Sequence, residues 1–227
     1  MTMAPEVTAS RRATAGLWPW AMAAGGVLFL IGGPLHPSSD SSLPESQATA
    51  ELIGGGTWIP SHALILAGAI GYLIGLFGLA RSRMPLSTSA RRAAWVAEVG
   101  AVLLAVEGVF HLGAFLDEDA ALAGDSTPIL STHMALSLVV YPLFTFAVGA
   151  LAVLSRRTLT HPVVGAVGAI GAVAFGVAPA LVGLAGIEAL ALLFPLGGAL
   201  IALWFTVVGV TALIRGLSGR AVASPAG

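Results

Sequence analysis

Four of the five histidines in this 227-residue chain lie near the ends of four different apolar segments. Two lie late and two lie early in their segments, so segments that alternate in direction place all four on the same side. The segments cover about 17–36, 58–80, 93–116 and 129–154, and their histidines are His36, His62, His111 and His133. With a helical rise of about 1.5 Å per residue, His36 ends its segment and the other three lie roughly 6 to 8 Å inside theirs. The sequence positions are unrelated, so this shared depth is the feature that most indicates chemistry.

Polar residues at four-residue spacing extend this layer toward the interior. Glu107 precedes His111 by four positions, so both side chains share one helix face and the carboxyl group lies one turn deeper. His133, Ser137 and Tyr141 repeat this spacing on the next segment. An ionisable group at such depth is costly against lipid. We therefore expect the two faces to turn toward each other and to line a pocket.

Imidazole nitrogens beside a carboxylate suit a divalent transition metal, because zinc, copper and iron commonly bind both groups. A single haem b held by two of the histidines is the alternative cofactor, whereas a two-haem relay across the membrane would need histidines at two depths. The predicted metal-binding residues are His36, His62, His111, His133 and Glu107. The predicted supporting polar residues are Ser137 and Tyr141.

Two further interpretations stay open. In a membrane metallohydrolase, three histidines would bind zinc and Glu107 would act as general base, although the chain contains neither His-Glu-x-x-His nor Gly-x-Ser-x-Gly. In a structural or partner-binding membrane protein without a cofactor, the histidines would be ordinary interface residues. Glu107 would then be a protonated carboxyl group hydrogen-bonded across the bundle. These residues do not decide whether the protein is an enzyme.

The composition excludes several classes of protein. Apolar residues make up 57% of the chain and charged residues 9%, against roughly 25% charged in a soluble domain, so a water-soluble fold is excluded. The formal net charge is −1 and all ten basic residues are arginines, which leaves no basic surface for nucleic acid. The absence of cysteine excludes disulfides and thiolate metal sites.

Six segments are apolar over the roughly 20 residues that a membrane helix needs. They cover about 17–36, 58–80, 93–116, 129–154, 163–184 and 189–214. We predict an all-α, polytopic membrane protein with six transmembrane helices in one bundle. Its parts are a tail at 1–16, the transmembrane domain at 17–214 and a second tail at 215–227.

The arginines orient these segments. They all lie before the first segment or after the second, fourth and sixth, at positions 11, 12, 81, 83, 91, 92, 156, 157, 215 and 220. The other connections carry acidic residues and no arginine. The positive-inside rule predicts that both termini are cytoplasmic and that the four histidines lie on the outer side. Glu98, near the cytoplasmic end of the third segment, is expected to snorkel toward the interface or to pair with Arg91 or Arg92.

The remaining segments carry few hydrogen-bonding side chains. The fifth and sixth are rich in glycine, which predicts close helix packing and a surface for a second copy or another membrane protein. The outer connection at 37–57 is rich in serine, proline and glycine, and is expected to be a lid or a disordered connector.

Three strings in the first two segments carry a family resemblance. They are Gly32-Gly33-Pro34-Leu35-His36-Pro37, Trp58-Ile59-Pro60-Ser61-His62 and Gly75-Leu76-Phe77-Gly78-Leu79-Ala80-Arg81. On these residues the chain resembles a group of uncharacterised six-helix membrane proteins of high-GC actinobacteria. The resemblance implies a multi-pass protein of a bacterial inner membrane and brings no activity, substrate or cofactor with it.

Overall fold

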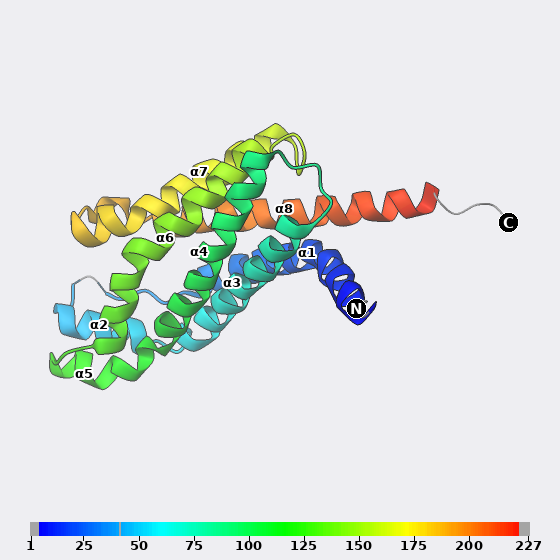
Figure 1. Cartoon of the computed structure of the whole chain (residues 1–227). Helices are drawn as coiled ribbons and strands as arrows, with labels where there is room; N and C mark the ends of the chain where they lie inside the picture. The colour runs from blue at the N-terminus through cyan, green and yellow to red at the C-terminus, as the bar shows by residue number, and fades with distance from the viewer. Residues whose placement is uncertain (1–4, 41, 223–227) are drawn as a thin grey trace.

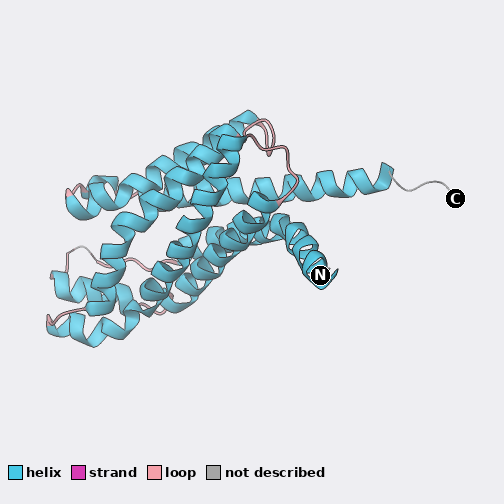
Figure 2. Ribbon diagram, in the orientation of Figure 1, coloured by secondary structure: helices cyan, strands magenta, loops and turns pink. Residues whose placement is uncertain are grey.

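The computed structural model describes residues 5–40 and 42–222, and the regular secondary structure within these ranges is helical throughout (Figure 2). Six helical segments are long and apolar enough to cross a membrane, which confirms the predicted number of spans. They are Gly16–Leu35, Trp58–Arg81, Thr88–Ala123, Pro128–Leu154, Pro162–Leu184 and Leu193–Gly216. The described part of the chain is therefore all-helical, and its six apolar helices suit a multi-pass membrane protein.

The six long helices pack side by side in the order of the chain (Figure 1). They are α1 (Pro5–Gly32), α3 (Trp58–Arg81), α4 (Thr88–Gly113), α6 (Pro128–Leu154), α7 (Pro162–Ala178) and α8 (Leu193–Val222). Each packs against the next, and α8 packs against α1, so the helices form a closed ring. Because every helix has two neighbours, each also turns one face toward a common interior.

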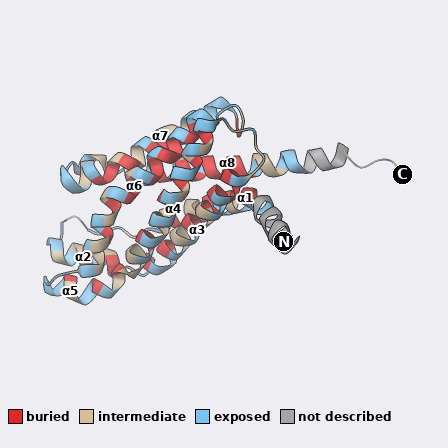
Figure 3. Cartoon of the chain, in the orientation of Figure 1, coloured by how far each residue is buried: buried red, intermediate tan, exposed pale blue. Residues whose placement is uncertain are grey.

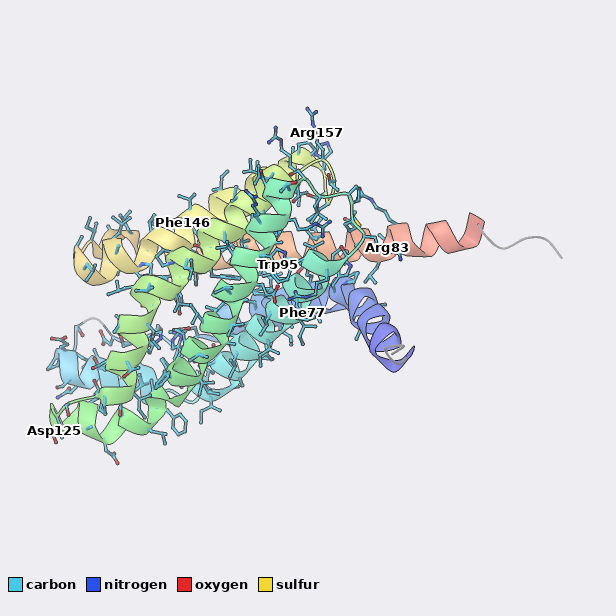
Figure 4. All side chains as sticks on the ribbon, in the orientation of Figure 1. Phe77, Arg83, Trp95, Asp125, Phe146 and Arg157 are labelled. Atoms are coloured by element: carbon cyan, nitrogen blue, oxygen red, sulfur yellow. The ribbon has the colours of Figure 1, made fainter. Side chains whose placement is uncertain are left out.

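Large apolar side chains fill this interior toward one end of the ring. We call it the arginine end, because the α3–α4 and α6–α7 loops with Arg83 and Arg157 lie there (Figure 4). The first turns of α1 and the last turns of α8 extend from the same end (Figure 1). Buried residues line the facing sides of the helices (Figure 3). One core cluster at this end includes Trp18, Met22, Leu76, Leu79, Trp204 and Phe205.

The opposite end carries two short helices, α2 (Glu45–Gly54) and α5 (Glu118–Ala123), and we call it the α2–α5 end. The connection at 37–57 is thus partly helical rather than disordered. Ile53 of α2 is buried in a second apolar cluster with Trp58 and Ala121, so α2 packs onto α5 and the start of α3. Asp117 fixes the start of α6, because one of its carboxylate oxygens accepts hydrogen bonds from the Ile129 and Leu130 amides, each at 2.8 Å.

Glycine residues let neighbouring helices of the ring approach each other closely. A Cβ atom added to Gly71 of α3 would lie 2.7 Å from Cα of Gly25 in α1. A Cβ atom on Gly168 of α7 would lie 2.5 Å from Cγ of Trp204 in α8, and one on Gly171 would lie 2.5 Å from Cβ of Leu200. The predicted close packing of the fifth and sixth spans is therefore packing of α7 on α8.

The expected pairing of Glu98 with Arg91 or Arg92 is wrong. Its carboxylate instead accepts a hydrogen bond from Nη1 of Arg81 at 2.8 Å, and the Arg81 guanidinium lies over the Trp95 ring. Arg91 is seven residues from Glu98 on the same helix, beyond the three- or four-residue spacing that brings side chains together. Its guanidinium donates to the carbonyls at 80, 82 and 84, which closes the α3–α4 loop.

Candidate metal centre

The four histidines predicted to share a depth form a continuous row at the α2–α5 end. The ring centroids are 4.8 Å apart for His36 and His62, 4.2 Å for His62 and His111, and 3.7 Å for His111 and His133. The residues come from the end of η1 (Gly33–Leu35), from α3, from α4 and from α6. We call these four residues the histidine row. Their order in the row follows the order of the helices around the ring.

Two of the strings singled out in the sequence, at 32–37 and 58–62, contact each other and position the first half of the row. The Ser61 hydroxyl donates to the Gly32 carbonyl at 2.8 Å, and a Cβ atom on Gly32 would lie 2.9 Å from the Ser61 carbonyl oxygen. The Trp58 ring packs against both neighbouring histidines, with centroids 5.5 Å from His36 and 3.9 Å from His62. Because α1 ends in small residues here, His36 reaches the first turn of α3.

Backbone carbonyls set the tautomers of His36 and His62. Nδ1 of His62 lies 2.7 Å from the Trp58 carbonyl oxygen, and Nδ1 of His36 lies 2.7 Å from the Pro37 carbonyl oxygen. A carbonyl oxygen only accepts, so both Nδ1 atoms carry hydrogen and both Nε2 atoms keep a lone pair, which in His62 accepts a hydrogen bond from Nε2 of His111. Loss of hydration lowers the pKa of His36, which favours the neutral ring. Both rings are thus prepared to bind a metal through Nε2.

One nitrogen from each of His36, His62 and His111 lies within 4.8 Å of the others, and we call these residues the first triad. The Nε2 atoms of His62 and His111 are 3.0 Å apart. Two nitrogens bound to one tetrahedral zinc ion at about 2.1 Å lie about 3.4 Å apart, so this spacing needs little adjustment. Three histidines around an ion also leave one position for water or substrate.

Glu107, His111 and His133 form a second triad with the same 4.8 Å limit. Glu107 is 2% exposed, and its Oε1 atom accepts hydrogen bonds from Nδ1 of His133 and, at 3.1 Å, from the Tyr141 hydroxyl. Nδ1 of His111 lies 3.9 Å from the same oxygen. The buried carboxyl group is therefore surrounded by polar partners from α4 and α6, as an ionisable group at this depth requires.

Of the two predicted supporting residues, Tyr141 contacts Glu107 and Ser137 does not. Tyr141 belongs to the cluster through its bond to Glu107. The Ser137 hydroxyl instead donates at 2.8 Å to the Met134 carbonyl of its own helix, although the residue lines the same cavity. A short hydroxyl side chain in a helix readily bonds to the preceding turn, which explains why Ser137 does not reach Glu107.

A cavity of about 900 Å³ extends from the histidine row into the ring. This volume is within the range of small-molecule sites, and most lining residues are apolar. Each of the six long helices contributes, for example through Phe29, Tyr72, Leu104, Tyr141, Phe175 and Ile201. The wall facing the histidines includes residues of η3 (Pro179–Leu184), a π-helical turn that continues α7. Residues 179–184 include no polar side chain from which a cavity wall could be predicted. Pro179 is the residue there whose type indicates an irregular helical turn.

Ring spacing favours an ion over a haem. Axial nitrogens on opposite sides of an iron lie about 4 Å apart at metal–nitrogen bonds of about 2.0 Å. Nε2 of His62 and Nε2 of His111 are closer than that, at 3.0 Å. His111 and His133 are stacked with their centroids 3.7 Å apart, which leaves no room for a porphyrin between them. These two neighbouring pairs therefore do not fit haem ligation in this arrangement.

Comparison of the chain with protein-family models, with curated proteins and with solved structures finds no match. What the protein does is therefore inferred from its own residues.

Proposed function

We propose that this is a membrane protein that binds a transition-metal ion at the α2–α5 end, through His36, His62 and His111. The observation that carries this proposal is the meeting of three imidazole nitrogens from three separate elements within 4.8 Å. Two of the rings have Nδ1 bonded to a backbone carbonyl, the arrangement that orients metal-binding histidines. Zinc, copper and iron suit neutral imidazole ligands.

The charge distribution supports an outward-facing site. Arg83 and Arg157 lie at the end opposite Asp125 (Figure 4), and the positive-inside rule assigns the arginine end to the cytoplasm. Both termini would then be cytoplasmic, and the histidine row would lie beneath the outer headgroups. The resemblance to actinobacterial proteins favours the inner membrane of a bacterium as the location.

The apolar cavity favours a second candidate function, a membrane metallohydrolase with a lipid-like substrate. A site with three histidines leaves a coordination position at which water is activated, and a nearby carboxylate serves as general base. Glu107 borders the same cavity as the three histidines. The cavity would hold the apolar part of the substrate beside this group.

Metal analysis of the full-length protein in detergent tests the proposed function. Protein purified after growth with supplemented zinc, copper and iron is expected to carry at least one ion per chain by elemental mass spectrometry. His62→Ala is expected to lose metal, because it removes a 1%-exposed ligand. His161→Ala is the matched control, because His161 caps the start of α7 through the Val163 amide, away from the row. A metal-free wild-type protein that also takes up no added metal would support the cofactor-free structural interpretation.

A further inference from the structure

We propose that the cluster holds two metal ions, one in each triad, bridged by the imidazole ring of His111. This inference rests on the proposed metal centre and extends it from one ion to two. The five predicted ligands do not form one group around a single ion. Their ligand atoms meet the 4.8 Å limit as two triads, and His111 belongs to both.

The two nitrogens of His111 face the two triads separately. Its Nε2 atom lies 3.0 Å from Nε2 of His62, a member of the first triad. Its Nδ1 atom lies 3.9 Å from Oε1 of Glu107, a member of the second. Each ring nitrogen therefore has a ligand of a different triad as its neighbour, which is the relationship that a bridging imidazole needs.

The other histidines of the row have one nitrogen committed elsewhere. Nδ1 of His36 and Nδ1 of His62 donate to backbone carbonyls. Nδ1 of His133 is bonded to Glu107, which leaves Nε2 of His133 to bind the second ion. Within the described ranges 5–40 and 42–222, the structure shows no backbone hydrogen bond to either ring nitrogen of His111. His111 is thus the one member of the row that can use both nitrogens as ligands.

The charges in the second triad also favour an ion there. A ring that binds two ions releases its nitrogen-bound hydrogen to solvent and carries one negative charge. Glu107, 2% exposed, carries a second negative charge when ionised. A divalent cation between them would offset the cost of burying both anions. Tyr141 would keep its hydrogen bond to Glu107 and hold the carboxylate in place.

Copper binding to the metal-free full-length protein in detergent tests this inference. After removal of excess Cu²⁺, two ions per chain are expected by elemental analysis. Ions bridged by an imidazole would lie about 6 Å apart, given metal–nitrogen bonds of about 2.1 Å. They would couple magnetically, so the integrated paramagnetic resonance signal should fall well below the copper content.

One variant of the second triad and one control outside both triads separate the outcomes. His133→Ala is expected to bind one Cu²⁺ per chain with a full signal, because it removes a ligand of the second triad only. His161→Ala should keep two coupled ions. One ion per chain in the wild type would overturn the two-ion inference and leave the proposed function standing, whereas no copper would overturn both. Two ions with a full signal would overturn the bridge, and this reading does not depend on whether a His111 variant folds.

Discussion

Nε2 of His62 and Nε2 of His111 lie 3.0 Å apart, although 49 positions separate the residues in the chain. The contact joins the second turn of α3 to the last turn of α4, two neighbouring helices of the ring. The Trp58 indole reinforces this contact by donating to the Leu112 carbonyl at 3.2 Å. The polar centre is thus built where antiparallel helices present opposite ends at one membrane depth.

Replacement of Glu107 tests how much the buried hydrogen bonds contribute to stability. Glu107→Ala leaves the His133 and Tyr141 donors without their acceptor, which costs about 1 to 3 kcal/mol for each unsatisfied group. Glu107→Gln keeps a carbonyl oxygen at the site and should lose much less stability. Thermal unfolding of the metal-free protein, followed by tryptophan fluorescence in detergent, measures both.

Glu98→Gln is the matched control for these variants. Glu98 is also on α4, but its ion pair with Arg81 is partly exposed and should contribute only about 0 to 1 kcal/mol. If Glu98→Gln lost as much stability as Glu107→Ala, the buried hydrogen bonds of Glu107 would contribute no more to the free energy of unfolding than a partly exposed ion pair.

The lowered pKa of His36 predicts a pH dependence of stability. Dehydration lowers the pKa of this histidine in the fold from its ordinary value of 6.5, so the unfolded chain binds the proton more readily. The contribution of neutral His36 to the free energy of unfolding is therefore fully present above pH 6.5. It is lost as the pH falls toward the pKa of His36 in the fold. His36→Asn, which does not titrate, should show a shallower decline in unfolding temperature between pH 7 and 5.

The metal-free protein is the sample for this measurement, because bound metal also depends on pH. His161→Asn serves as the comparison, since it removes a histidine outside the row. Identical pH profiles for His36→Asn and the wild type would contradict the assignment of this decline to His36.

Hydropathy and arginine positions predict the six spans, because a spanning helix must be apolar along its whole length. The sequence also predicts that four histidines share a depth, which follows from helical rise alone. It does not predict which side chains meet. Ser137 and Tyr141 belong to the same predicted stripe, yet only Tyr141 bonds to Glu107.

The far wall of the cavity could not be predicted for a related reason. Phe175 and Phe194 are apolar residues in apolar helices, so nothing in their types separates cavity lining from lipid contact. The packing of α7 on α8 and of α8 on α1 brings them into the lining of the cavity that the histidines share. Long-range packing therefore determines the cavity.

Gly168 tests the packing of α7 on α8. Gly168→Ala adds a Cβ atom that would lie 2.5 Å from Cγ of the fully buried Trp204, so one of the two helices must shift. Overpacking of this kind costs about 1 to 3 kcal/mol. Gly216→Ala in α8 is the control, since nothing lies within 4 Å of its added Cβ atom and the alanine favours the helix. Equal unfolding temperatures for both variants would contradict the close packing of these helices.

Bound metal is expected to stabilise the fold, and removal of the metal should reverse this effect. An ion that binds the folded protein and not the unfolded chain raises the free energy of unfolding by about 2.7 kcal/mol at 100 times its dissociation constant. Zinc added to the metal-free wild type should therefore raise the unfolding temperature in a concentration-dependent way, and a chelator should reverse the rise. His62→Ala should abolish most of the rise because it removes a buried ligand of the first triad, whereas His161→Ala should leave it unchanged. An equal rise in His62→Ala would place the zinc elsewhere, for example at the acidic residues 117–119 at the start of α5.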